Sequence, residues 1–194
     1  MSKSDEKLQI VAFSTNDTYQ TPNDIINMFL EEQNHVLLKK TRNAIAFTTS
    51  LNKSQNSTKI MICSILNLGR EYTGITDVNC YLIFIDLTKE TSKEKFESIL
   101  NYVKDYCDFS KKIFIFGMIN SENTEENKII QKDEIIKSAG KAEIIYEYNE
   151  IDLSKKKEIF NTIMNILIYS SQNSISGEAT EEKEEGQSGS CEIF

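Results

Sequence analysis

The segment Cys80 to Leu87 (CYLIFIDL) limits the choice of fold more than any other part of the sequence. It is apolar almost without interruption over the length of one strand. A strand with one face in water alternates apolar and polar residues, whereas a continuous apolar run is typical of a parallel strand covered on both faces. The run therefore predicts a strand at the centre of a parallel sheet. Lys112 to Gly117 (KIFIFG) predicts another buried strand.

Around these two runs, strand and helix patterns alternate along the chain. Further strands are predicted at Leu8 to Phe13, Asn43 to Leu51, Lys59 to Leu66 and Ala142 to Tyr148. Helices are predicted at residues 24–30, at 91–107 with a hydroxyl cap, at 132–139 closed by Gly140, and around 159–167. The second and third strands are expected to form a hairpin. The fold class is therefore α/β, a three-layer α/β/α sandwich with a mostly parallel six-stranded sheet and one antiparallel edge strand.

Length, composition and charge narrow the classes of function. The chain has 194 residues and 39% hydrophobic content, which predicts one domain over residues 1–170 and a flexible acidic tail over 171–194. A net charge of −8 argues against a nucleic-acid partner, because such surfaces concentrate Lys and Arg. The cysteines show no C-x-x-C spacing and predict reduced thiols in a cytoplasmic protein. The only histidine, His35, has no companions for a metal site, so no metal is expected.

The last four residues form a C-a-a-X box, Cys191-Glu192-Ile193-Phe194. This pattern predicts a prenyl group on Cys191, and a terminal Phe is typical of the geranylgeranyl class. The preceding arm has neither a polybasic patch nor a second cysteine close by, and a single chain binds membranes reversibly. We therefore expect exchangeable attachment to the cytosolic face of an internal or plasma membrane, or capture of the lipid by a prenyl-carrier protein.

The segment Lys59 to Leu100 resembles small GTPases of the Ras superfamily, most closely the Rab branch. Residues 66–71 (LNLGRE) stand where that family has D-T-A-G-Q-E, and residues 86–92 (DLTKETS) stand at the entry to the following helix. The resemblance implies a P-loop small-GTPase-like fold for residues 1–170. It also implies nucleotide-binding positions at Thr15, Asn16, Thr21 and Asn120, and a partner-binding former switch region at Asn67, Gly69, Arg70, Glu71 and Tyr72.

The motifs that hold and hydrolyse guanine nucleotides are degraded in this sequence. A phosphate loop brings backbone N–H groups around the phosphates with glycines and adds a lysine, yet residues 12–21 (AFSTNDTYQT) contain neither. Leu66 replaces the metal-side aspartate, and Arg70 replaces the glutamine that orients water. Neither register near Asn120 supplies both the lysine and the aspartate of N-K-x-D, and residues 147–150 do not match S-A-K.

These observations predict a pseudo-GTPase without catalytic residues or cofactor. It would be prenyl-anchored and would act through protein effectors as an adaptor in membrane trafficking or signalling. One alternative is a divergent switch that still binds GTP or GDP with Mg²⁺. A second is a soluble flavodoxin-like binding module, because residues 14–21 carry the hydroxyls of a flavin phosphate loop, though not its glycines.

Overall fold

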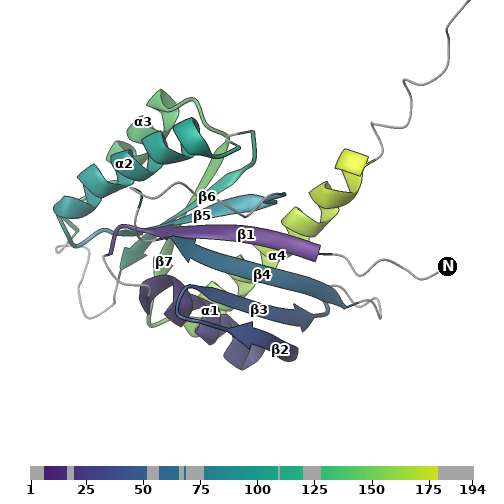
Figure 1. Cartoon of the computed structure of the whole chain (residues 1–194). Coiled ribbons are helices and arrows are strands. Elements are labelled where there is room, and N and C mark those ends of the chain that lie inside the picture. Colours follow the sequence, from purple (N-terminus) through teal and green to yellow (C-terminus); the bar gives the residue numbers. More distant parts are fainter. Residues whose placement is uncertain are drawn as a thin grey trace, which may run out of the picture.

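The computed structural model describes residues 7–16, 20–51, 57–65, 68, 77–108, 110–119 and 128–178, with the backbone alone at 20–21 and 174–178. The helices are α1 (Gln20–Glu32), α2 (Thr91–Tyr106), α3 (Lys132–Lys141) and α4 (Lys156–Glu178). The strands are β1 (Lys7–Ser14), β2 (His35–Lys40), β3 (Ala44–Thr49), β4 (Thr58–Ile65), β5 (Cys80–Asp86), β6 (Ile113–Ile119) and β7 (Tyr146–Asp152). Figure 1 shows how these elements are arranged.

One mixed sheet contains all the described strands, in the order β2-β3-β4-β1-β5-β6-β7. The five strands from β4 to β7 in this order are parallel, while β3 is antiparallel to β4 and β2 is antiparallel to β3. The predicted α/β class, the central position of β5 and the β3–β4 hairpin are confirmed. The predicted count of six strands is wrong, because β2 adds a seventh at the edge.

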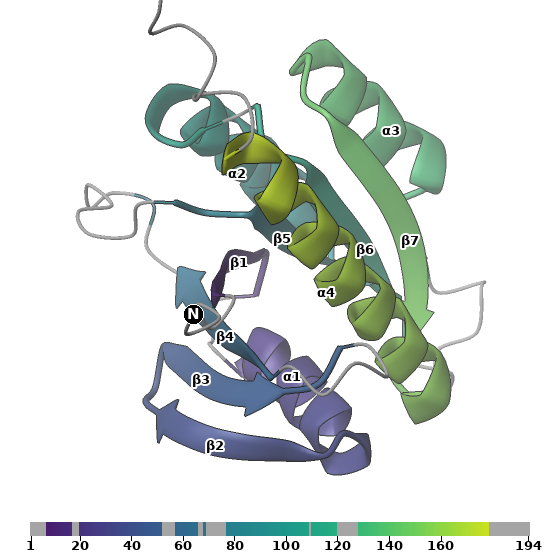
Figure 2. The same cartoon turned by 90° about the vertical axis from the view of Figure 1, so that its right-hand side faces the viewer.

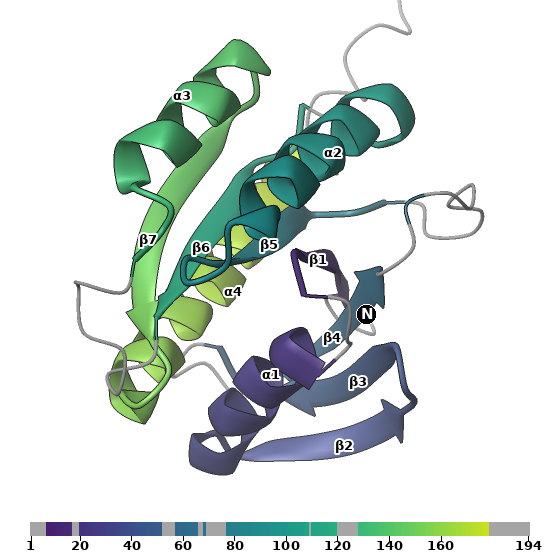
Figure 3. The same cartoon turned by 90° about the vertical axis from the view of Figure 1, so that its left-hand side faces the viewer.

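Two apolar cores hold helices against the two faces of the sheet, which gives the three layers. Figures 2 and 3 show α1 and α4 on one face and α2 and α3 on the other. On the first face, Phe29 of α1 stacks on Phe160 of α4 with ring centroids 5.3 Å apart. On the second face, Phe13 of β1 meets Tyr102 of α2 edge-on at 6.0 Å. Since side chains alternate along a strand, β1 supplies residues to both cores.

The additional strand β2 differs from the others because none of its residues is buried. Its six residues (HVLLKK) are all exposed, including Val36 at 64%, Leu37 at 49% and Leu38 at 48%. The pairing with β3 shifts register between Leu37 and Lys39, as in a β-bulge. A strand without a buried face needs neither an alternating pattern nor a long apolar run, so this segment carries no periodic signal.

The boundary between α3 and β7 also differs from the prediction. Helix α3 begins at Lys132 as predicted and has a capping box between Gln131 and Glu134. It continues to Lys141, past Gly140, and Glu143 then takes a positive φ of 57°. This turn delays the strand, so β7 begins at Tyr146 and not at residue 142.

The last helix is longer than the sequence suggested. Helix α4 runs to Glu178, so residues 171–178 of the predicted tail are helical. Ser170 and Ser171 lie buried near this end of the helix. The C-terminal half of α4 therefore lies over the beginnings of the central strands, at the end of the molecule where β1 begins (Figure 1).

Candidate functional site

The topology of the sheet indicates a candidate site at the carboxyl ends of the parallel strands, between β1 and β5. From β1 the chain continues to β4 on one side, whereas from β5 it continues through α2 to β6 on the other. In open α/β sheets, ligands bind outside the carboxyl ends of the strands where the strand order reverses in this way. The residues that follow β1 and β5 therefore form the candidate site.

Thr15 follows β1 directly and is only 2% exposed. Its backbone N–H donates to the carbonyl of Phe84, at 2.9 Å. Its hydroxyl donates to Ser92 Oγ at 3.0 Å and accepts from the backbone N–H of Asp86 at 3.1 Å. The hydroxyl is therefore already used in both directions, and it ties the end of β1 to the end of β5 and the start of α2.

A second set of contacts lies outside this buried one. Lys89 Nζ donates to Asn16 Oδ1 at 3.0 Å and lies 3.2 Å from Asp86 Oδ2. The other carboxylate oxygen of Asp86 accepts from the backbone N–H and the hydroxyl of Thr88, at 3.0 and 2.6 Å. The Lys89 side chain remains 58% exposed. Lys89 therefore reaches across the candidate site from Asp86 to Asn16, and its ammonium group is paired with the Asp86 carboxylate.

The start of α2 corrects one prediction. The N-cap residue is Glu90, and no side chain caps the helix, so the predicted hydroxyl cap is wrong. Ser92 is fully buried in the first turn, and its oxygen accepts the hydrogen bond from Thr15. Ser92 is therefore used for a tertiary contact and not for capping the helix. Ser92 and Lys89 are site residues that motif comparison missed, although Lys89 follows the predicted strand end closely.

The predicted nucleotide-binding and partner-binding residues fall into two groups. The structure brings Thr15 and Asn16 together with Asp86 and Lys89, as described above. The remaining predicted positions lie outside the described residues: Asn67, Gly69, Arg70, Glu71, Tyr72, Asn120, Cys191 and the side chain of Thr21.

The residues that were compared with the S-A-K motif belong to β7. These residues, 147–150, lie inside the strand and not in the segment after it. The segment after the strand contains Ser154 and Lys155 instead. Asp152 closes this turn, because its Oδ1 accepts from the backbone N–H and hydroxyl of Ser154 at 3.0 and 2.9 Å.

Comparison with known proteins adds no relative: the chain matches no protein-family model and no curated protein. Within the described ranges, no three His, Cys, Asp or Glu side chains gather as a metal site would require. None of the helices in the described part of the chain is both long and apolar enough to cross a membrane.

Proposed function

We propose that this chain is a Ras/Rab-like pseudo-GTPase, tethered by a prenyl group on Cys191 and acting through protein contacts as an adaptor in trafficking or signalling. The observation that carries the proposal is the state of Thr15, which stands at the position of the phosphate loop. Its hydroxyl is buried and bonded to Ser92 and to the Asp86 backbone. A phosphate would have to displace this contact, and residues 12–21 would offer it neither a glycine nor a lysine.

The sheet supports the same family in a more general way. Without β2, its strands form a six-stranded sheet that is parallel except for β3 at the edge, as the resemblance implies. The candidate site also lies where the strand order reverses. A retained sheet with a filled site is what loss of nucleotide binding would leave.

The exposed edge strand supports action through protein contacts. Three consecutive apolar side chains, Val36 to Leu38, are about half exposed or more, on a strand with one edge that pairs with no described strand. Lys39 and Lys40 follow and make no ion pair among the described residues. Exposed sheet edges pair with extended segments of other chains, and apolar side chains beside them strengthen such pairing.

The experiment is a measurement of nucleotide content and affinity. Full-length protein is purified with Mg²⁺ and denatured, its supernatant is run on anion exchange, and the apo form is titrated with fluorescent GDP and GTP. We expect no nucleotide and no binding from a folded monomer. Near-stoichiometric nucleotide or submicromolar affinity would contradict the proposal.

A divergent nucleotide switch is the second candidate, and specific residues favour it. Lys89 spans the candidate site, and Ser154 and Lys155 follow β7 at the same end of the sheet. If this alternative holds, Lys89→Ala weakens GDP binding strongly while Lys111→Ala at the opposite end does not. A flavodoxin-like module would instead purify with visible flavin absorbance.

The lipid anchor is tested separately. Incubation with a geranylgeranyltransferase and geranylgeranyl diphosphate should add one geranylgeranyl group to the intact mass, and Cys191→Ser should prevent it. The modified protein should then float with vesicles, and the Cys191→Ser protein should not. An unchanged mass for the natural sequence would remove the anchor from the proposal while leaving the pseudo-GTPase untouched.

A further inference from the structure

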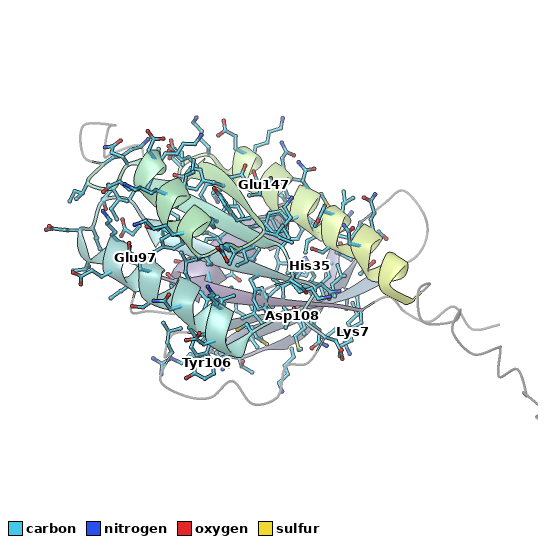
Figure 4. All side chains as sticks on the ribbon, turned by 90° about the horizontal axis from the view of Figure 1, so that it is seen from above. Lys7, His35, Glu97, Tyr106, Asp108 and Glu147 are labelled. Atoms are coloured by element: carbon cyan, nitrogen blue, oxygen red, sulfur yellow. The ribbon has the colours of Figure 1, made fainter. Side chains whose placement is uncertain are left out.

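The opposite end of the sheet holds a pocket of about 590 Å³. Its walls come from the start of β1, the segments before β5 and β6, and the C-terminal half of α4. In Figure 4, Lys7 lies at the end of the molecule where α4 ends. The described lining residues include Lys7, Gln9, Asp77, Asn79, Lys111 and Tyr169. Ligand sites of small molecules commonly have volumes of a few hundred to about 1,000 Å³.

Gln9 is the residue that points to a ligand. It lies in β1 among buried strands and is only 8% exposed. Its backbone is fully used, because its N–H donates to Asn79 Oδ1 at 2.7 Å and its carbonyl accepts from the Asn79 N–H at 2.8 Å. Its side-chain amide, however, has no hydrogen-bond partner among the described residues. Buried amides almost always have partners, so an unpartnered amide on a residue that lines a pocket indicates a missing polar group.

The charges of the lining indicate the sign of that group. Lys7 and Lys111 form no ion pair with any described residue. Lys112 also lines the pocket, but its ammonium lies 2.7 Å from Glu147 Oε2. The only acid among the described lining residues is Asp77. Two unpaired ammonium groups therefore face one acid in a chain whose net charge is −8, which favours an anionic ligand.

We propose that this amino-end pocket binds a phosphate monoester carried by a small organic group. A phosphate monoester carries close to two negative charges at pH 7, which matches Lys7 and Lys111, and the amide of Gln9 can donate to one of its oxygens. Lysine ammonium groups can approach a phosphate group from any direction. A planar carboxylate is matched best by the two parallel N–H groups of an arginine. No arginine is among the described lining residues. Val78 and the Tyr169 ring offer apolar surface to the organic part.

The ligand could be a free metabolite or the headgroup of a lipid, which share this chemistry. The proposal does not depend on the pseudo-GTPase assignment, because the pocket lies at the opposite end of the sheet from Thr15. The soluble probe is glycerol 3-phosphate. The membrane probe is a phosphatidylcholine vesicle containing phosphatidic acid, compared with one containing phosphatidylserine at equal charge.

The test uses full-length, unlipidated protein at constant ionic strength. Glycerol 3-phosphate is titrated while backbone amide resonances are followed by NMR, and the vesicles are tested by flotation. The Lys7→Ala/Lys111→Ala double variant removes both ammonium groups, and Gln9→Leu removes the amide. The matched control is Lys137→Ala/Lys157→Ala, which makes the same change of charge at exposed positions on α3 and α4. Thermal unfolding of each variant checks that it is folded.

We expect saturable shifts of amide resonances near Gln9, Asn79 and Ser110, and at least about tenfold weaker binding for the Lys7/Lys111 variant. Gln9→Leu should weaken binding about threefold to tenfold, and the control should bind like the natural sequence. Binding to phosphatidic acid vesicles alone, with the same variant pattern, would assign the phosphate to a lipid. No binding of either probe, or equal losses in the control pair, would overturn the proposal.

Discussion

The polar side chains at the two ends of the parallel strands differ in whether they have hydrogen-bond and ion-pair partners. At the carboxyl end, Thr15, Ser92 and Asp86 bond to one another, and Lys89 is held by Asp86 and Asn16. At the amino end, the Gln9 amide and two lysine ammonium groups have no described partners. The carboxyl end is thus internally satisfied, whereas the amino end has unused hydrogen-bonding and charge capacity.

This difference matters because the strand order and the unpaired polar groups favour a ligand site at different ends of the sheet. The strand order favours the carboxyl end, where open α/β sheets bind ligands. The unsatisfied groups favour the amino end, since a buried polar group without a partner costs free energy until a ligand supplies one. In this molecule the polar groups at the position expected from topology bond to one another, and the buried amide without a described partner lies at the other end.

The largest expected effect tests whether the carboxyl end is structural. Thr15→Val keeps the shape of the side chain but leaves the Asp86 N–H and the Ser92 hydroxyl without their partner. We expect the free energy of unfolding to fall by about 2 kcal/mol, because buried groups left unpaired cost about 1–3 kcal/mol each. Urea denaturation with an unchanged m-value measures this loss.

Two further variants sharpen that measurement. Thr15→Val/Ser92→Ala removes both hydroxyls and should cost less than the sum of the single variants, because it leaves fewer buried groups unpaired. Thr162→Val removes a hydroxyl that bonds only to the Glu158 carbonyl on the exposed side of α4. It should change stability by less than about 0.5 kcal/mol. A Thr15→Val cost as small as this control would mean that the carboxyl end is open to a ligand after all.

The second prediction concerns Cys80, the first residue of β5, which contacts the pocket-lining residue Ser170. The Ser170 hydroxyl donates to Cys80 Sγ at 3.2 Å, and burial raises the pKa of the Cys80 thiol from its ordinary value of 9.0 to about 12. At pH 8 roughly one thiol in ten thousand is therefore ionised. We expect iodoacetamide to alkylate Cys80 at least about 100-fold more slowly in the native protein than in urea. Peptide mass spectrometry measures the rate.

The same thiol gives a pH dependence of known sign. Because the pKa of Cys80 is higher in the folded state than in the unfolded state, the unfolded chain releases this proton first as pH rises. Stability from this group is complete below about pH 9 and is lost between about pH 9 and 12. A Cys80→Ala variant should lose this part of the alkaline destabilisation. Native Cys80 alkylated as fast as half-buried Cys107 would show that the pocket opens into the core.

The central parallel strands could be predicted from the sequence because burial on both faces produces continuous apolar runs, as in Cys80 to Leu87. Helix α2 was found through its periodic apolar residues. Strand β2 was missed because none of its residues is buried, and the start of β7 was misplaced because the turn at Glu143 leaves no glycine or proline signal. The exposed Val36 to Leu38 looks like core in a sequence and is surface in the structure.

For the candidate sites, the sequence could suggest single residues at most, and it could not predict their contacts. Thr15 and Asn16 were found by family resemblance, but their bonding to Ser92 and Lys89 joins residues more than seventy positions apart. Gln9 was not predictable as a site residue, since a glutamine within an apolar strand gives no motif. Only the structure shows that Gln9 is buried and lines a pocket together with lysines from the segment before β6.

The smallest expected effect tests whether Lys112, unlike Lys7 and Lys111, is kept from the ligand by its ion pair with Glu147. The Lys112 ammonium donates to Glu147, which holds the pKa of that carboxyl below its ordinary value. The folded pKa is the lower one, so the stability from this pair is present above the ordinary glutamate pKa and is lost as pH falls. Because Glu147 is largely exposed, Glu147→Gln should cost less than about 1 kcal/mol. It also frees Lys112 toward the pocket, so glycerol 3-phosphate affinity should rise about threefold. An unchanged affinity in the same NMR titration would mean that Lys112 is held by the Tyr169 ring, 4.4 Å away, and only Lys7 and Lys111 serve the ligand.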